Sequence, residues 1–331
     1  MVLRSSNIHN NQIVLKDTVH VSPEIVNTSN VNVNDIIVVV RNGSRKLIGK
    51  HARVLKAMPN TVIGAFMTGI RSQNSKFVNA LFDGDIFQRE IYKNLGATIN
   101  QITIKSFKEM EFYIPQNHEK QIIGNLISQI DNLLALQQRK LKLIKVELSA
   151  ILQQLLSQKS TWPNYKLSQV VSIQDNKRVP VKRQDRISGP IPYYGANGVQ
   201  DYVDGYTHKG DLILIAEDGA NSLTNYPIYF VNGKIWANNH THVLRPNKEV
   251  NPLFLTVTLK QINYSKYVVG GSRYKLNLED LKSIKLNIPN RAQQDKIGGI
   301  YNKFYQVQLK ENHKLKLLHK IKHFLLQNMF I

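Results

Sequence analysis

Cysteine is absent from all 331 residues of the chain. Disulfide bonds and thiolate metal sites are therefore excluded, and a reducing compartment, the cytoplasm, is the simplest expectation. The chain also has no run of about eighteen apolar residues, the length that a membrane-spanning helix needs. Its first residues lack the apolar core of a signal peptide. We therefore expect no membrane segment.

Acidic residues are scarce. There are 23 of them against 44 lysines and arginines, which gives a formal net charge of +21. A surface this basic implies a polyanionic partner, and nucleic acid is the leading candidate. An anionic membrane surface is the alternative, but the basic residues are spread along the chain and are not gathered in one block.

Catalytic signatures are also missing. The sequence has no Walker A pattern for ATP, no glycine-rich cofactor loop after a strand, and no Asn-Pro-Pro-Tyr-like motif of adenine methyltransferases. Residues 287–290 are only superficially similar to that motif, because they contain no aromatic residue to stack a flipped base. Asp83, Asp85 and Glu90 fit the solvated start of a helix better than a nuclease site. We therefore expect no enzymatic activity in this chain alone.

What the sequence does contain is a long internal repeat. Residues 96–157 recur without a gap as residues 270–331, so that Gly96 matches Gly270 and Ile123 matches Ile297. Residues 34–43 match residues 210–219, whereas residues 45–95 have little counterpart. A repeated frame with a diverged middle is typical of one scaffold that carries two different recognition surfaces.

A heptad pattern marks the repeated part. Apolar residues follow 4-3 spacing from Ile123 to Leu155, interrupted once by Gln137, and a matching seam runs from Ile297 to Met329 with polar residues at Gln308 and Glu311. The first seam predicts a helix of about 39 residues, roughly 58 Å long. We expect the two helices to pair, with Gln137 meeting Glu311 and fixing the register. The alternative is that each helix only covers its own domain.

The remaining segments contain short runs of β-type residues, such as residues 36–40, 212–216 and 228–231, broken by Asn, Gly, Ser and Asp turns. The expected fold class is α/β (α+β), in which two globular domains alternate with two long helices that form an antiparallel coiled coil with pseudo-twofold symmetry. The expected boundaries are 1–116 and 160–290 for the domains, and 117–159 and 291–331 for the helical regions.

This arrangement resembles the specificity subunit of type I restriction–modification systems over essentially the whole chain. The resemblance implies that the two globular domains are target recognition domains. The segments that carry the resemblance are residues 3–8, 35–44, 64–67, 99–102, Ile114-Pro115, Trp162 with Lys166-Leu167, residues 193–198 and residues 270–273. One departure concerns the first domain. The second domain has residues 162–193 up to its Tyr-Gly-Ala-Asn motif, but the first begins almost at the corresponding position. We interpret it as a truncated, rearranged or late-start product.

The resemblance implies a non-catalytic subunit that recognises a bipartite site in double-stranded DNA. It also implies docking to two modification (methyltransferase) subunits and to restriction (translocase/endonuclease) subunits. The complex would use S-adenosylmethionine, ATP and Mg²⁺, none of them bound by this chain. Two alternatives stay open: the recognition part of a stand-alone restriction or methylation enzyme, and a coiled-coil scaffold that binds nucleic acid.

Side chains that read DNA lie on loops that reach base edges and phosphates. In the first domain the candidates lie in three places. These are a basic loop after a strand, a segment near the start of the chain, and the segment equivalent to a basic loop of the second domain. They are Arg41, Asn42, Ser44, Arg45 and Lys46, then Arg4, Ser5 and Asn7, then Asn100 and Gln101. A polar hairpin turn is the alternative for the first loop, since Asn-Gly pairs favour such turns.

In the second domain the candidates occupy equivalent positions. They are Tyr194, Asn197, Asn221, Asn239, His240, Arg273 and Lys275. Glu217 replaces a basic residue here, and a carboxylate can accept from the amino group of cytosine. His240 and His242 are expected on one strand face, but no third ligand with suitable spacing follows, so we predict no metal site.

Repeated lysines off the helix seams are the candidates for docking the methyltransferase subunits. They are Lys140, Lys142, Lys314 and Lys316. A solvated basic face of each helix is the alternative.

Overall fold

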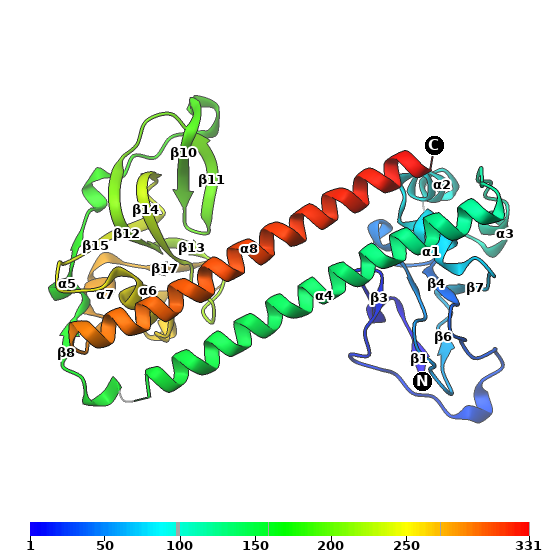
Figure 1. Ribbon diagram of the computed structural model, residues 1–331, viewed down its shortest axis with the longest axis horizontal. Coiled ribbons are helices and arrows are strands. Elements are labelled where there is room, and N and C mark those ends of the chain that lie inside the picture. The colour runs from blue at the N-terminus through cyan, green and yellow to red at the C-terminus, as the bar shows by residue number, and fades with distance from the viewer. Residues whose placement is uncertain (97–99, 158, 272, 331) are drawn as a thin grey trace. The chain divides into compact units, whose positions relative to one another are not determined.

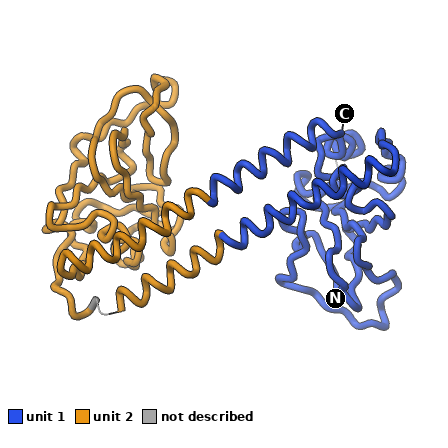
Figure 2. Tube along the Cα trace, viewed as in Figure 1, with its two compact units in different colours: residues 1–140, 311–331 blue, residues 141–310 orange. Residues whose placement is uncertain are grey.

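The computed structural model of the protein describes residues 1–96, 100–157, 159–271 and 273–330. Ile99 and Ser272, from two of the segments that carry the resemblance, lie outside the described residues. The chain divides into unit 1, residues 1–140 with 311–331, and unit 2, residues 141–310 (Figure 2). Each long helix contributes one part to each unit. The domain boundaries expected from the sequence, which assign each helix to a region of its own, stay a prediction.

Unit 1 is built on short strands and three small helices. Its elements are β1 (Val2–Leu3), β2 (Ile8–His9), β3 (Gln12–Ile13), β4 (Ile36–Val39), β5 (His51–Arg53), β6 (Val62–Ile63), β7 (Met67–Ile70), α1 (Ser75–Asp83), α2 (Asp85–Asn94) and α3 (Ile104–Lys108). The fully buried β4 lies between β5 and β7. The first predicted strand is therefore confirmed as the centre of this sheet.

Unit 2 has longer strands. Its elements are β8 (Asn164–Lys166), α5 (Leu167–Val170), β9 (Val171–Ile173), β10 (Ser188–Gly195), β11 (Gly198–Val203), β12 (His208–Ala216), β13 (Asp218–Ala220), β14 (Ile228–Ala237), β15 (Thr241–Pro246), α6 (Pro252–Lys260), β16 (Val268–Val269), β17 (Tyr274–Leu276), α7 (Leu278–Ser283) and β18 (Lys285–Asn287). The main sheet has the order β11-β10-β14-β12-β15-β9, and Figure 1 labels these strands except β9.

The two sheets share one frame. Val38 of β4 is paired with Thr68 of β7, and the matching Leu214 of β12 is paired with Val243 of β15. The parallel pair β1–β6 in unit 1 likewise matches the parallel contact between β10 and β14 in unit 2. The repeat read from the sequence is therefore a repeat of strand register and not only of residues.

Two long helices, α4 (Asn117–Leu155) and α8 (Arg291–Met329), contain 39 residues each. In unit 1, α4 residues Ile127 and Leu134 and α8 residues Leu318 and Leu325 belong to one apolar core. In unit 2, Leu148 and Leu152 of α4 share a core with Ile297 and Tyr301 of α8. The predicted length of the first helix and the pairing are confirmed.

The predicted polar pair is present. The Gln137 side-chain amide donates to the Glu311 carboxylate at 2.6 Å and to the Glu311 carbonyl oxygen at 2.9 Å. These residues occupy the same position in the two copies of the repeat, 174 residues apart. Asp131 meets Lys322 at 2.5 Å, so residue numbers fall along α4 as they rise along α8. The helices are therefore antiparallel and related by a local pseudo-twofold axis in unit 1.

The seam departs from strict heptads at the helix ends. Leu152 and Leu156 are more deeply buried than Ile151 and Leu155, which were expected in the seam. Leu326 and Phe330 at the equivalent end of the second copy behave in the same way. At these ends each long helix packs on a globular domain as well as on the other helix. More than two residues per heptad are therefore buried there.

Among the described residues, no helix has the length and apolar character needed to cross a membrane.

Candidate nucleic-acid interface

Three segments that are distant in the sequence meet beside the end of β4. The Asn42 side chain donates to the Ser5 hydroxyl oxygen at 3.1 Å, and the Asn42 backbone amide donates to the Asn100 carbonyl oxygen at 3.2 Å. The Asn100 side chain donates in turn to the Gly43 carbonyl oxygen at 3.0 Å. The predicted residues of the first domain therefore form one surface, which we call loop cluster 1 (Arg4, Ser5, residues 41–46, Asn100 and Gln101).

Loop cluster 1 is strongly basic. Arg4, Arg41, Arg45 and Lys46 are all exposed. The Arg41 guanidinium lies 4.9 Å from the ring centre of the exposed Phe66, which holds it above the surface. Cations presented on loops in this way bind phosphate oxygens without regard to sequence.

Two residues were missed in the sequence. Lys50 lies outside the predicted loop, yet its ammonium group donates to the Ser5 carbonyl oxygen at 3.4 Å. Burial lowers the pKa of Lys50. Phe66 belongs to a segment singled out only for the family resemblance. Pairing of β4 with β5 and β7 brings both to the cluster, and no local pattern signals that pairing.

Asn7 must be removed from the candidates. Its side chain is completely buried, donates to the carbonyl oxygens of Val14 and Lys16, and accepts from the Arg4 backbone amide. An asparagine with its side chain used in this way holds the chain in place and is not available to a base. Asn42 is also engaged, since its side-chain oxygen accepts from the Ser44 amide at 3.0 Å. We therefore infer that Asn42 fixes the turn, and not, as expected, that it reads a base.

Unit 2 brings together an equivalent surface. The Asn197 side chain donates to the Gly219 carbonyl oxygen at 3.0 Å. Strand β13 pairs with β17, with Asp218 opposite Lys275. Arg273 and Asn221 are exposed at the ends of these strands. We call this surface loop cluster 2 (Asn197, residues 218–221, Asn239, His240, Arg273 and Lys275).

The charge of loop cluster 2 is mixed. The His240 ring nitrogen Nδ1 lies 3.7 Å from an Asp218 carboxylate oxygen, and both side chains are about half exposed. Asn239, Arg273 and Lys275 are exposed beside them. The cluster therefore offers an acceptor and donors where loop cluster 1 offers almost only donors. The two surfaces therefore differ in the hydrogen-bonding groups that they expose.

Tyr194 lies apart from these exposed residues. It is half-buried and packs against Tyr229, with 6.3 Å between ring centres. Burial raises the pKa of its phenol. Its ring therefore packs on the sheet, and its contact with DNA stays a prediction.

A family model described as "Type I restriction modification DNA specificity domain" matches residues 2–146 and 159–321. The chain belongs to this family. The two matched stretches each contain one loop cluster, so the specificity domain occurs twice.

Two curated relatives extend the comparison. A putative type I restriction enzyme specificity subunit of Haemophilus influenzae is 47% identical over 134 residues, which cover 40% of this chain and 35% of that protein. A putative type I specificity subunit of Mycoplasma pneumoniae is 28% identical over 149 residues, which cover 43% of this chain and 40% of that protein. Each match spans less than half of the relative.

Solved structures share the fold. The S subunit of a type I restriction-modification system from M. genitalium matches with a TM-score of 0.69 at 19% identity, covering 99% of this chain and 91% of that chain. A chain from a study of assembly and conformational transition of the type I R-M system matches with a TM-score of 0.50 at 12% identity, covering 98% and 89%. The α/β architecture with two long helices is therefore that of solved specificity subunits.

A partly buried ionic cluster lies within the second specificity domain. Asp175, Glu217 and His242 place ligand atoms within 4.8 Å of one another, a spacing that suits a metal ion. These atoms already have partners, however. His242 contacts the Asp175 carboxylate at 2.6 Å through one nitrogen and the Leu276 carbonyl oxygen at 2.9 Å through the other. Arg178 pairs with Glu217. The cluster is therefore an internal ion-pair network.

Two expectations change because of this network. His242 is buried whereas His240 is half exposed, so they do not share one strand face. Glu217 is paired with Arg178 and cannot serve as a free acceptor for cytosine. Burial acts to raise the pKa of Asp175, but hydrogen bonds from His242 and the Val243 amide outweigh it, and the pKa lies below its ordinary value.

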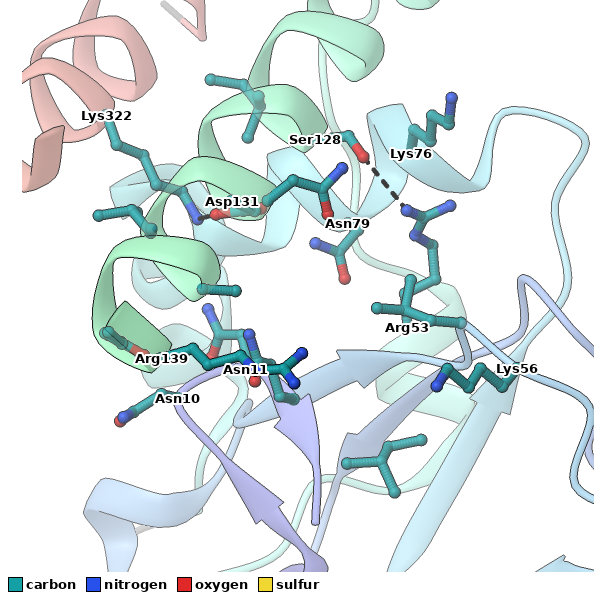
Figure 3. A pocket seen from close by; sticks show the side chains of 18 of the residues that line it. Asn10, Asn11, Arg53, Lys56, Lys76, Asn79, Ser128, Asp131, Arg139 and Lys322 are labelled. Carbon is teal, nitrogen blue, oxygen red and sulfur yellow. Dashed lines mark hydrogen bonds and ion pairs between the residues drawn. The ribbon is translucent and has the colours of Figure 1, made fainter. Parts of the chain in front are cut away.

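A basic cleft of about 1030 Å³ lies in unit 1, lined by β3, the end of β5 and α4 (Figure 3). Arg53 donates to the Ser128 hydroxyl at 3.3 Å, and Lys322 is held by Asp131. Lys56 and Arg139 also line the cleft. The cleft adds positive charge to the unit, but none of the residues of loop cluster 1 line it.

The four helix lysines divide into two kinds. The ammonium groups of Lys140 and Lys314 lie 3.0 and 3.3 Å from the same Glu311 oxygen, so they belong to the helix pair itself. Lys142 and Lys316 are exposed. Only the second pair remains a simple candidate for docking a partner.

Proposed function

We propose that the chain is the DNA-recognition subunit of a type I restriction–modification complex and that each loop cluster reads one half of a bipartite DNA site. The supporting observation is the pair of loop clusters, built on the same strand register but carrying different side chains. A repeated frame positions both clusters in the same way, and the differing residues give each its own base preference.

Charge supports DNA as the ligand. The net charge is +21, and loop cluster 1 presents four exposed cations on loops. Such cations release counterions from the phosphate backbone and supply affinity that is independent of sequence. Exposed Asn221 and Asn239 in loop cluster 2 can pair with base edges, and asparagine is suited to adenine.

The rest of the complex is part of the same proposal. Two modification subunits would bring S-adenosylmethionine and the methyltransferase chemistry, and restriction subunits would bring ATP- and Mg²⁺-dependent translocation and cleavage. This chain would supply recognition and docking without catalysis, in the cytoplasm. Exposed Lys142 and Lys316, repeated on the two helices, are the docking candidates.

The decisive experiment is selection of bound duplexes from a random DNA pool, with and without the modification subunits. We expect an enriched sequence with two specified parts separated by unspecified base pairs. Enrichment of a single continuous run of a few base pairs would contradict two-domain reading. No enrichment above random in either arm would contradict sequence recognition altogether.

The substitution Lys46→Ala tests whether loop cluster 1 contacts the phosphate backbone of DNA. Removing one phosphate contact should weaken binding to all sequences and lower the slope of log K against log salt by about one. Lys320→Ala, on the exposed face of α8, is the matched control with the same change in charge. Equal effects of the two variants would show that only net charge matters and that Lys46 makes no contact.

A further inference from the structure

The basic cleft of unit 1 carries positive charge that the protein itself does not neutralise. Asp131 is the only carboxylate among its described lining residues, and Lys322 already binds it at 2.5 Å. In the described part of the chain, the side chains of Lys56 and Arg139 have no hydrogen-bond or ion-pair partner. The cations that line the cleft are Arg53, Lys56, Lys76, Arg139 and Lys322. The cleft therefore has capacity for an anion.

Arg53 is a half-buried cation with neutral hydrogen-bond partners. Its guanidinium donates to the Asn34 side-chain oxygen at 3.0 Å and to the Ser128 hydroxyl oxygen at 3.3 Å. Burial lowers the pKa of Arg53, and the charge of Asp131 opposes that effect only in part. Removing a cation from water costs free energy unless an opposite charge compensates for it. An anion bound in the cleft would supply that compensation.

The cleft also contains a hydrogen-bond acceptor without a donor. Asn79 of α1 lines the cleft, and its side-chain oxygen is buried and has no hydrogen-bond partner. In the view of Figure 3, Asn79 lies between Asp131 and Arg53. Buried polar atoms nearly always have a partner, so an unpaired one needs an explanation. A ligand with a hydroxyl or amino group would donate to this oxygen.

Apolar side chains line the same cleft. They are Ile13, Leu15, Leu55 and Met58. Leu15 is 59% exposed and Leu55 is 58% exposed, so apolar surface is left in water beside the cations. The volume of about 1030 Å³ is close to the upper end of the range for sites that bind small organic molecules. The cleft is therefore suited to an organic ligand and not only to an inorganic ion.

Unit 2 shows that the fold does not require these charges. The register of β4 with β5 equals that of β12 with β14, so Arg53 corresponds to Val231. The repeat aligns Lys322 with Leu148. Val231 and Leu148 are buried apolar residues, so the same frame folds without cations at these positions. The charges of the cleft belong to unit 1 and not to the shared frame.

We propose that the cleft of unit 1 is a binding site for a nucleoside phosphate, separate from the DNA-reading surface. The cations of the cleft would bind the phosphate oxygens, and a doubly charged phosphate suits several cations better than a single carboxylate does. The apolar side chains would contact the base, and the Asn79 oxygen would accept from an amino or hydroxyl group. None of the residues of loop cluster 1 line the cleft, so the proposal does not depend on DNA recognition.

Calorimetric titration of the full chain tests the site with the four common nucleoside monophosphates. We expect saturable binding of at least one of them, with one molecule per chain. Inorganic phosphate and the matching nucleoside should each bind at least about tenfold more weakly, because each lacks one part of the ligand. Equal binding of the nucleoside would overturn phosphate recognition, and equal binding of inorganic phosphate would overturn an organic ligand. Absence of saturable binding by all four would overturn the site.

Two variants locate the binding in the cleft. Arg139→Ala changes an exposed residue without a partner, so the chain should fold, by circular dichroism, and bind the nucleotide at least about tenfold more weakly. Arg89→Ala, exposed on α2 and outside the cleft, is the control with the same change in charge. Asn79→Leu, similar in volume, removes the unpaired acceptor and should also weaken binding. Equal effects of Arg139→Ala and Arg89→Ala would overturn the proposal.

Duplex DNA distinguishes the cleft from the DNA-reading surface. Saturating duplex should leave the affinity for the nucleotide unchanged, and Arg139→Ala should lower DNA affinity no more than Arg89→Ala does. Competitive displacement of the nucleotide by duplex would assign the cleft to the DNA interface and overturn a separate site. Because nucleotide binding is measured without DNA, its result does not depend on whether the chain reads a DNA sequence.

Discussion

At the scale of single residues, polar groups in the helix seam set the register of unit 1. Gln137 and Glu311 are equivalent positions of the repeat and bind each other, and Lys140 and Lys314 flank the carboxylate. A misregistered helix pair would bury the Glu311 charge without these partners. The observed register is therefore favoured because every alternative register would leave the Glu311 carboxylate without partners.

The Glu311 carboxylate makes stability depend on pH. The hydrogen bond from Gln137, together with Lys140, lowers its pKa from 4.5 to about 2. Because folding favours the ionised form, its contribution is complete above pH 4.5 and is lost as the pH falls from there toward 2. We expect the stability difference between wild type and Glu311→Gln, from urea unfolding, to shrink over that range.

Exposed Glu147, in the interior of α4, serves as the control for that measurement. Glu147→Gln should give a stability difference near zero at every pH. If the difference between wild type and Glu311→Gln is the same at pH 7 and pH 3, the carboxylate has no special partner in the folded chain.

Lys322 is a second residue with a specific partner set. Its ammonium group lies 2.7 Å from Asp83 and 2.5 Å from Asp131, and the Asp83 side chain is 2% exposed. Asp83 was expected at a solvated helix start; instead it ends α1 and is buried. Lys322→Ala removes one partner of that carboxylate, which keeps His51 and the Asn11 side-chain amide, so we expect a loss of roughly 1–3 kcal/mol in the free energy of unfolding.

The matched control for Lys322 is again Lys320→Ala, which should change stability by less than about 0.5 kcal/mol. Adding Asp83→Asn to Lys322→Ala should restore part of the loss, because the uncompensated charge is then removed. A loss that the second substitution does not reduce would show that lost side-chain packing, and not charge, causes the effect.

At the scale of elements, each long helix makes a close approach to a short helix of its globule. A Cβ atom on Gly124 of α4 would lie 2.6 Å from the Phe77 backbone nitrogen in α1. A Cβ atom on Gly298 of α8 would lie 2.7 Å from the side-chain oxygen of Asn251 and 3.2 Å from the Phe254 backbone nitrogen, at the start of α6. Glycine recurs at this position in both copies because the backbones meet there, not because the helix needs flexibility.

This packing predicts an inverted glycine effect. Gly124→Ala should destabilise unit 1, although alanine favours helix formation by about 1 kcal/mol over glycine. Gly299→Ala, where no atom lies within 4 Å of the added carbon, should instead stabilise the chain by roughly that amount. If the contact at Gly124 is real, the unfolding temperature falls for Gly124→Ala and rises for Gly299→Ala. If it is not, the unfolding temperature rises for both variants.

At the scale of the whole molecule, the duplication offers two similar surfaces to two copies of one partner. Exposed Lys142 and Lys316 occupy the same position of the repeat on α4 and α8. Lys140 and Lys314 belong to the Glu311 network and are unsuitable for a charge-reversal test.

Reversal of both exposed charges, Lys142→Glu with Lys316→Glu, should weaken methylation by the assembled complex by at least about tenfold, since opposed like charges destabilise an interface. The isolated variant should fold and bind DNA with only the loss expected from its lower net charge. Lys303→Glu with Lys310→Glu, also exposed on α8, is the control. Methylation unchanged by the first pair would place the docking surface elsewhere.

The sequence by itself determined the repeat, the two long helices, the Gln137–Glu311 pair and the family. These features depend on periodic apolar residues and on identical positions in two copies, which are local or repeated signals. It also indicated which loops would carry the recognition residues, because strands and turns differ in composition.

Only the tertiary structure decided which of those loop residues are available. Asn7 is buried, Asn42 fixes a turn, and Glu217 is paired with Arg178, while Lys50 and Phe66 join loop cluster 1. The physical reason is that hydrogen-bond partners and exposure are set by strand pairing between distant segments. The identity of a polar residue does not reveal whether a base or the protein's own backbone satisfies it.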